Sequence, residues 1–238
     1  MTESTVKLAR MTRFIQFALA MAVVFGAQLA TAQISSGSVV QLDYASNFEN
    51  LNGGPFTGSV ISGPGAGSTF ASFCLEKLET FNLNTNLFVK SVTTATTNAT
   101  GVYPTTGDPL SSETAWLFTQ YSNHASGFST TTASKSNSMQ NAFWYLEGEI
   151  TLSKLNEDSQ AKTWANEAKS AVSTGAWSGL GNVRVLNLYK DAGYSINAQD
   201  QLVMLAPVPE PETYAMLLAG LGLMGAVTRR RRSRTEVA

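Results

Sequence analysis

The stretch NEDSQAKTWANEAKSAVSTG, residues 156–175, is the clearest helix signal in the chain and does most to decide the fold class. Acidic residues occupy its first turn and Gly175 follows its last turn, both typical of helix boundaries. Between them, apolar residues recur at helical spacing: Ala161, Trp164, Ala165, Ala168 and Val172. The stretch therefore predicts an amphipathic helix with one face buried.

Two further helices are expected on the N-terminal side of this one. SSETAWLFTQYSNHA (111–125) begins with serines that can cap a helix, and NSMQNAFWYLEGE (137–149) places Met139, Phe143 and Leu146 along one face. Strand-like patterns surround this helical region, at residues 39–45, 69–76, 86–94, 183–189 and 200–207. Helices grouped between strands favour an α+β fold, here a single β-rich domain, sandwich or barrel-like, with about three mid-chain helices.

The remaining segments of the middle region are rich in turn-forming or small polar residues. Residues 50–68 combine Gly, Pro, Asn and Ser and predict a loop. The Thr/Ser tracts at 91–100 and 129–138 indicate loops or exposed strand edges.

The N-terminus has the features of a signal peptide over residues 1–32. A basic segment, Lys7 to Arg13, precedes an apolar run that is short for a membrane span, and Ala30 and Ala32 form a small-x-small cleavage site. We expect signal peptidase to cleave after Ala32; an uncleaved anchor is the alternative.

The C-terminus, residues 207–234, combines three elements in a fixed order. The triplet Pro209-Glu210-Pro211 precedes an apolar segment, 214–227, expected to form a short transmembrane helix. The cluster Arg229, Arg230, Arg231 and Arg232 follows and is expected to remain cytoplasmic as a membrane stop. Fourteen apolar residues are few for a permanent span, so anchoring at the inner membrane should be transient.

This C-terminal arrangement closely resembles the PEP-CTERM sorting signal of Gram-negative bacteria. The resemblance implies recognition by an exosortase, removal of the tail near the triplet, and release to the cell envelope or extracellular matrix. It leaves residues 33–206 as the exported domain, here called the ectodomain. The ectodomain carries thirteen acidic and eight basic residues, so nucleic acid is not expected as a partner.

The ectodomain offers little for metal, cofactor or turnover chemistry. It has a single histidine, His124, and a single cysteine, Cys74, without metal-ligand spacing, so we expect no metal, no cofactor and no enzymatic activity. Glu147 and Glu149 are two residues apart on a predicted helix, point in different directions, and are expected to be solvated. Trp177 is the tryptophan best placed for stacking on a glycan.

An unpaired thiol is unusual in an exported protein, and Gln140 is a candidate partner for it. A thiol held against a glutamine side chain can expel ammonia and form a Cys–Gln thioester, and Phe73, Phe143 and Trp144 could shield that bond from water. The segments Phe73-Cys74-Leu75 and Gln140-x-Ala142-x-Trp144 resemble those of the thioester, or TQXA, domains of bacterial adhesins.

The sequence departs from that family pattern at one position and leaves other interpretations open. Met139 stands where the family has Thr, and Gln120, in a second Thr-Gln pair, competes with Gln140. An inert buried thiol and an intermolecular disulfide are the alternatives for Cys74. The resemblances together imply an adhesive or biofilm-associated protein whose thioester bonds once to a surface amine, a hydroxyl or exopolysaccharide. A non-covalent carbohydrate-binding module and a polysaccharide hydrolase are the alternative functions.

Overall fold

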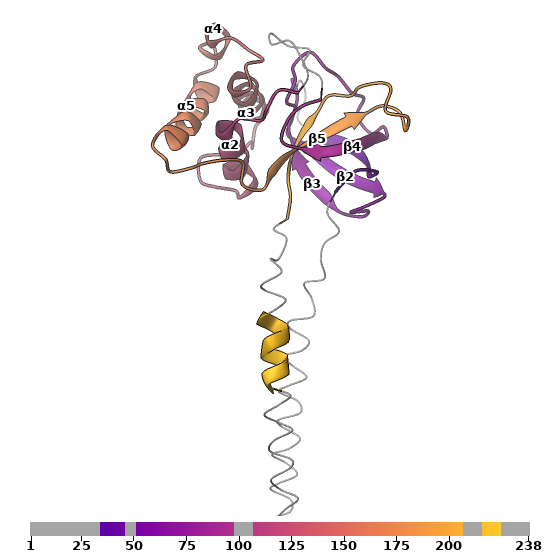
Figure 1. Ribbon diagram of the computed structural model, residues 1–238. Helices are drawn as coiled ribbons and strands as arrows, with labels where there is room; N and C mark the ends of the chain where they lie inside the picture. The colour runs from indigo at the N-terminus through magenta and orange to yellow at the C-terminus, as the bar shows by residue number, and fades with distance from the viewer. Residues whose placement is uncertain (1–33, 46–50, 98–106, 207–215, 225–238) are drawn as a thin grey trace, which may run out of the picture. The chain divides into compact units, whose positions relative to one another are not determined.

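The computed structural model describes residues 34–45, 51–97, 107–206 and 216–224. The chain divides into two units at Leu205/Ala206, and each is described by itself. Among its described residues, the first unit has six strands and four helices: β1 Val39–Tyr44, β2 Phe56–Ser62, β3 Thr69–Ser72, β4 Leu87–Thr93, α2 Ser112–Ser122, α3 Ala133–Leu146, α4 Leu152–Leu155, α5 Ser159–Ser173, β5 Val183–Tyr189 and β6 Gln201–Met204. It is an α+β fold in which the helices form one side and the sheet the other (Figure 1).

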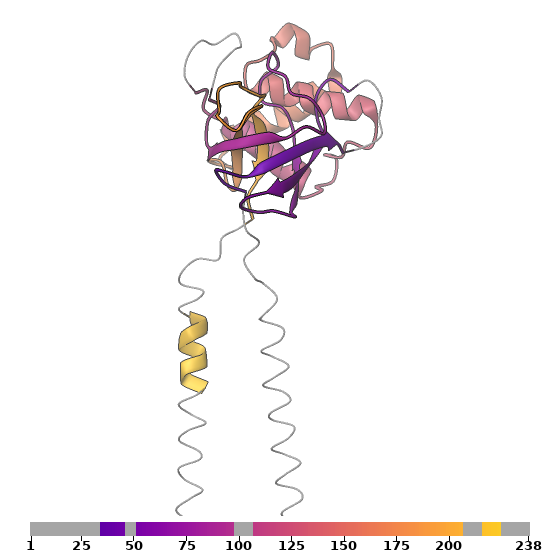
Figure 2. The same ribbon diagram turned by 90° about the vertical axis from the view of Figure 1, so that its right-hand side faces the viewer.

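The six strands form one antiparallel sheet in the order β3-β2-β1-β4-β5-β6. The sheet curls until its two ends meet (Figure 2). The segment that continues β3 pairs with β6, where the Leu75 N–H donates to the Asp200 carbonyl (3.1 Å) and the Leu202 N–H donates to the Phe73 carbonyl (3.0 Å). Of the two β architectures expected from the sequence, the barrel-like one describes this curled sheet.

Two apolar cores lie on opposite sides of the segment that follows β3. Phe73 and Leu75 belong to the core between the sheet and the helices, together with Trp164 of α5. Cys74, between them, belongs to the core inside the curled sheet, together with Trp144 of α3. This alternation follows from the period of two in extended backbone, which sends successive side chains to opposite faces.

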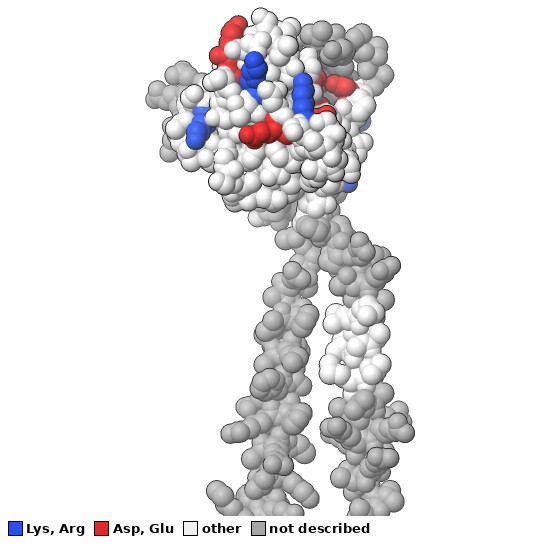
Figure 3. Space-filling view, turned by 90° about the vertical axis from the view of Figure 1, so that its left-hand side faces the viewer, with Lys and Arg blue, Asp and Glu red and all other residues white. Residues whose placement is uncertain are grey.

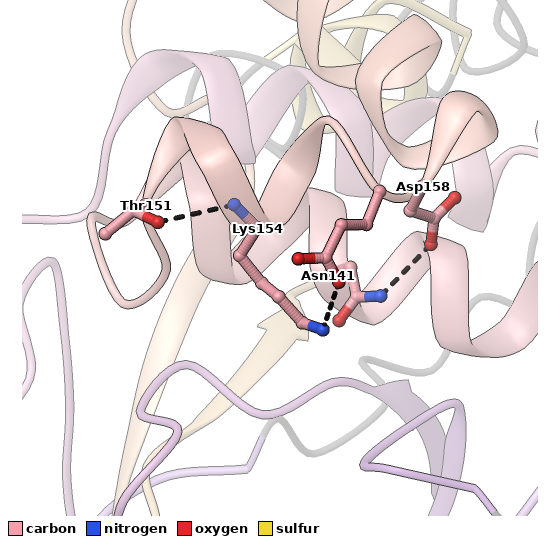
Figure 4. Close-up of polar contacts among 5 residues, drawn as sticks. Asn141, Thr151, Lys154 and Asp158 are labelled. Atoms are coloured by element: carbon pink, nitrogen blue, oxygen red, sulfur yellow. Dashed lines mark hydrogen bonds and ion pairs between the residues drawn. The ribbon is translucent and has the colours of Figure 1, made fainter.

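The helices are capped and tied to one another by polar side chains. Asp158 caps α5 by accepting from the Ala161 N–H (3.0 Å), and it also accepts from the Ser138 hydroxyl of α3 (2.9 Å). Its other carboxylate oxygen accepts from the Asn141 side chain of the same helix (3.0 Å; Figure 4). One carboxylate therefore fixes the start of α5 against α3. On the outer face seen in Figure 3, Lys, Arg, Asp and Glu side chains are interspersed rather than gathered by sign.

Several local expectations need correction. Residues 56–62, expected within a loop, form β2, because Phe56 and Val60 are buried and the backbone pairs with β1 and β3. Part of the tract 129–138, expected as a loop or strand edge, is helical, because Thr132 caps α3 and the helix starts at Ala133. A short helix, α4, was not expected.

In the second unit the structure describes Ala206 and residues 216–224, and the latter are helical. Within the described ranges, no helix has both the length and the apolar character needed to cross a membrane. The predicted signal peptide with Ala30 and Ala32, the Pro209-Glu210-Pro211 triplet, the ends of the segment 214–227 and the arginine cluster at 229–232 lie outside the described residues.

Candidate functional site

Cys74 and Gln140 lie in contact, although 66 residues separate them in sequence. The Gln140 carboxamide Nε2 donates to the Cys74 carbonyl (2.8 Å), and its Oε1 accepts from the Cys74 N–H (3.1 Å). Oε1 also accepts from the Gly54 N–H (2.9 Å). Both residues are buried, so the amide is held in a dry setting with two backbone donors on its carbonyl oxygen.

Helix α3 positions Gln140 because one apolar face of the helix packs in the core between helices and sheet and another packs inside the curled sheet. Met139 and Phe143 pack in the core between helices and sheet, whereas Trp144, one turn after Gln140, packs inside the curled sheet. Side chains four residues apart share a helix face, so Gln140 and Trp144 both point towards the sheet.

The loop before β2 closes over the Gln140 amide. A Cβ on Gly53 would lie 2.7 Å from Gln140 Cγ and Oε1, and the residue has a φ of +118°. A Cβ on Gly54 would lie 2.7 Å from the Phe73 ring and 2.9 Å from the Ser72 carbonyl oxygen. Two consecutive glycines therefore let the backbone reach the amide closely enough for the Gly54 N–H to bond it.

The three residues expected to shield the site are buried around it. The Phe73 and Phe143 rings pack against each other, with centroids 4.8 Å apart, in the core between helices and sheet. Trp144 lies in the other core and lines a pocket that Cys74 also lines. Cys74 and Gln140 thus lie where the two cores meet, with Phe73 and Phe143 in one and Trp144 in the other.

A second glutamine, Gln201 of β6, contacts the thiol itself. Its Nε2 donates to Cys74 Sγ at 3.7 Å, and Cys74 and Gln201 are paired in an antiparallel bridge. Burial raises the pKa of the Cys74 thiol to about 12, and the hydrogen bond from Gln201 and the N–H groups of Gly54 and Cys74 act in the opposite direction. The thiol is therefore protonated at neutral pH.

A pocket of about 250 Å³ adjoins Cys74. Aromatic and aliphatic side chains supply much of its wall: Tyr44, Phe56, Phe81, Leu83 and Trp144. Polar groups complete the lining, namely Asn52, Lys77, Glu79, Thr80 and Gln199 with Gly53 and Cys74. Lys77 Nζ lies 5.8 Å from the centroid of the Trp144 ring. The pocket thus offers a small molecule or side chain an approach to Cys74.

Two buried carboxyl groups near the site have structural roles. Burial raises the pKa of Glu76 to about 10, and the negative charge of Asp200 acts in the same direction, so Glu76 is neutral at physiological pH. Burial also raises the pKa of Asp200, although it accepts hydrogen bonds from Thr97, Asn187 and Leu188 that favour its charged form.

The expectation that Glu147 and Glu149 are both solvated is wrong for Glu147. Glu147 is buried at the end of α3, where its Oε1 accepts from the Ser111 N–H (3.2 Å) and hydroxyl (2.6 Å) at the start of α2. Burial raises the pKa of Glu147 to about 7. Glu149 accepts from the Lys77 N–H (3.0 Å).

The other candidates from the sequence lie apart from the pocket. Gln120 is on α2 and does not line the pocket, so the geometry favours Gln140 over Gln120 as the partner of Cys74. His124 is exposed just after α2, with a φ of +52°. The half-buried Trp177 donates to the Gly179 carbonyl (2.9 Å) within its own turn. Among the described residues, no group of three or more His, Cys, Asp or Glu side chains could hold a metal ion.

Sequence reasoning missed three residues of this site: Gly53, Gly54 and Gln201. Asn-Gly-Gly-Pro at 52–55 indicates a turn, and Gln201 falls within a predicted strand. The double glycine before a proline was the available signal for a close backbone approach, but nothing in the sequence identified Gln140 as its target.

Comparison with known families adds one match, at the C-terminus. Residues 207–232 match the PEP-CTERM protein-sorting motif. The chain is therefore marked as a substrate of the exosortase sorting pathway, which implies export and membrane-associated sorting. Neither the curated proteins nor the solved structures provided a match to this chain.

Proposed function

We propose that the ectodomain forms an internal thioester between Cys74 and Gln140 and uses it once to attach the protein covalently to a partner outside the cell. In the first step, Cys74 Sγ attacks the Gln140 side-chain carbonyl carbon. The carbon–nitrogen bond breaks, the thiol proton leaves with the amide nitrogen as ammonia, and a carbon–sulfur bond remains. In the second step, an acceptor attacks the same carbon, and the sulfur leaves and regains a proton.

One observation carries the proposal: Gln140 Oε1 accepts from both the Gly54 and the Cys74 N–H groups. Two preorganised donors on a carbonyl oxygen stabilise the negative charge that develops there during attack, as in an oxyanion hole. A buried glutamine needs hydrogen bonds in any case, but this pair of donors includes the backbone of the attacking residue itself. The contact thus holds the electrophilic amide against the backbone of the residue that carries the nucleophile, which favours the proposed attack.

The pocket beside Cys74 is the proposed route for the acceptor. A primary amine attacks a thioester without prior deprotonation by a strong base, whereas a sugar hydroxyl needs a general base to become nucleophilic. The exposed His124 does not line the pocket, so an imidazole base is not supplied there by the described residues. We therefore favour an amine of a surface protein or aminated polysaccharide over a hydroxyl.

The sorting motif gives this chemistry a cellular setting. The proposed sequence is export, transient anchoring at the inner membrane, exosortase processing and release into the envelope or extracellular matrix of a Gram-negative bacterium. A covalent bond formed there would make the protein an adhesive or biofilm-associated component. Each molecule would react once, so the protein is not proposed to be an enzyme.

The mass of the purified full chain tests the thioester directly. Relative to its sequence after any terminal processing, wild-type protein is expected to be lighter by one ammonia, and Cys74→Ala and Gln140→Glu are expected to lack this deficit. Gln120→Asn is the matched control and should retain it. Incubation with methylamine should abolish the deficit and leave an adduct on the peptide containing Gln140. Wild-type protein of unshifted mass that gives no methylamine adduct would overturn the proposal.

Non-covalent carbohydrate binding at the same pocket is the second candidate. The Tyr44 and Phe56 rings stack with centroids 5.5 Å apart, and Phe81 meets Phe56 edge-on at 5.3 Å, giving aromatic surface of the kind that sugar rings pack against. Polysaccharide retention that survives Cys74→Ala but is lost in Phe81→Ala would favour it. Hydrolysis has less support, because among the described residues lining the pocket Glu79 is the one carboxylate, and a glycoside hydrolase commonly uses two.

A further inference from the structure

Cys74 has two glutamines beside it: Gln140 bonds its backbone with both ends of the amide, and Gln201 bonds its sulfur with the amide nitrogen. Gln140 directs its carbonyl oxygen to backbone donors, including that of Cys74, whereas Gln201 directs its amide nitrogen to Cys74 Sγ at 3.7 Å. Both glutamines are completely buried. A second buried amide beside the thiol is not needed to form the thioester bond itself, so its orientation calls for an explanation.

The surroundings of Gln201 fix which end of its amide meets the sulfur. The Ser72 hydroxyl lies 2.9 Å from Gln201 Oε1 and 2.8 Å from the Leu202 carbonyl oxygen. At the other end, Gln201 Nε2 donates to the Gln199 carbonyl at 3.5 Å. Because a carbonyl can only accept, it favours the NH₂ end of the amide on its side, which is the side of Cys74 Sγ.

We propose that Gln201 is a positioning residue for the thioester chemistry, donating its N–H to the sulfur as the sulfur gains negative charge. The inference rests on the proposed thioester function. During formation, the N–H orients the thiol and stabilises it as it loses its proton. During transfer to the acceptor, the same N–H stabilises the departing sulfur. Gln201 itself forms and breaks no covalent bond in either step.

The electrostatics around the thiol explain why a hydrogen-bond donor to the sulfur would stabilise the thiolate. Burial disfavours the thiolate and raises the pKa of Cys74 to about 12. Glu76 is neutral at physiological pH, and the pocket brings one cation, Lys77, and one acid, Glu79. The pocket charges are therefore balanced, and hydrogen bonds are the main stabilising contacts given to the sulfur. The bond from Gln201 is the only one of these that a side chain supplies among the described residues.

Methylamine opening of the purified full chain, followed by mass spectrometry, tests this role. Gln201→Met keeps the approximate length and removes the donor; opening is expected to slow by about tenfold or more, the usual range for a hydrogen bond to a charged group. Ser72→Ala keeps Gln201 but removes the hydroxyl beside its oxygen, and should slow opening less. Thr119→Ala, a change of similar size on α2 away from the pocket, is the matched control and should open at the wild-type rate.

Gln201→Glu gives a result that a purely structural role would not produce. Its side chain can donate only while its carboxyl is protonated, so the opening rate, corrected for free methylamine, should fall as pH rises through the titration of that carboxyl. Wild-type protein should lack this step. The inference is overturned if the Met and Glu variants open at the wild-type rate with the wild-type pH profile. A wild-type protein without a thioester would instead overturn the proposed function, so the two failures are distinguishable.

Discussion

Gly53 leaves no room for a side chain beside the Gln140 amide. Its φ is +118°, and a Cβ added there would lie 2.7 Å from Gln140 Oε1, so any side chain would displace the amide from its two donors. Gly53→Ala is therefore expected to abolish or strongly reduce the mass deficit of one ammonia. Intact-mass measurement of the purified full chain checks this expectation.

Gly67→Ala is the matched control for this substitution. Gly67 also has a positive φ, +86°, but a Cβ there would meet nothing within 4 Å. The control variant carries a similar backbone cost, about 1 kcal/mol, without touching Gln140. Equal mass deficits in the two variants would show that the close approach of Gly53 does not position the amide.

At this scale, the sequence predicts the pair Cys74 and Gln140 but not the residues around it. An unpaired cysteine in an exported chain is an anomaly, and a Gln-x-Ala-x-Trp pattern on a helix offers a partner; the structure places Cys74 and Gln140 in contact. Gln201 could not be predicted, because its contact depends on β6 pairing with the segment after β3, 127 residues earlier. A pairing between sequence-distant segments leaves no local pattern to read.

At the scale of elements, the junction of α3 with α2 should make stability depend on pH. The pKa of Glu147 is raised from 4.5 to about 7 in the folded protein, so the fold retains a proton that the unfolded chain releases. Stability contributed by the protonated form is complete below about pH 4.5 and declines as pH rises towards 7. Over that interval the free energy of unfolding should fall by about 3 kcal/mol.

Glu147→Gln tests this dependence, because an amide oxygen can still accept from Ser111 but does not titrate. Chemical denaturation at pH 5 and pH 7.5 should show a loss of stability in the wild type that is reduced in the variant. Glu167→Gln, at an exposed position of α5, is the matched control and should behave like the wild type. Parallel profiles for wild type and Glu147→Gln would contradict the expectation.

The junction of α3 with α5 depends on a different carboxylate. Asp158→Ala removes the cap of α5 and the acceptor for Ser138 and Asn141 in one step, and should lower the free energy of unfolding by about 2 kcal/mol. Glu157→Ala, which breaks only the exposed ion pair with Lys154, should cost less than about 1 kcal/mol. Similar losses in urea unfolding for both variants would argue against the cap.

The helices and strands differ in how clearly the sequence predicts them. The helix at 156–175 was predictable because its stripe and boundaries agree, and α5 lies within it. β2 was not, since its Phe-Thr-Gly-Ser-Val-Ile-Ser sequence lies among Gly and Pro residues that indicate turns. Its burial comes from pairing on both edges, with β1 and β3, and this tertiary contribution outweighs the weak local signal.

At the scale of the whole molecule, the sorting motif predicts the fate of the C-terminus. Replacing Pro209, Glu210 and Pro211 by alanine should block exosortase processing, because the motif at 207–232 contains this triplet. The variant should keep the peptide with the arginine cluster at 229–232 and stay with the membrane fraction, while wild-type protein loses it. Peptide mapping after cell fractionation measures both.

Glu212→Ala, just beyond the triplet, is the matched control for the processing experiment. It should be processed like the wild type. A triplet variant that loses its arginine cluster as efficiently as the control would exclude the triplet as the determinant of processing.

The curled sheet has a mechanical consequence once the proposed thioester is considered. The bond would tie the segment after β3 to α3, and β6, the last strand before the tail, is hydrogen-bonded to that same segment. Tension between an acceptor on Gln140 and the C-terminal end of β6 would then cross the boundary between helices and sheet. Before reaction that boundary would carry a covalent tie, and after transfer to the acceptor it would be held by packing and hydrogen bonds alone. Attachment would thus convert a stiff module into one that can yield under pulling and lengthen before the external bond breaks.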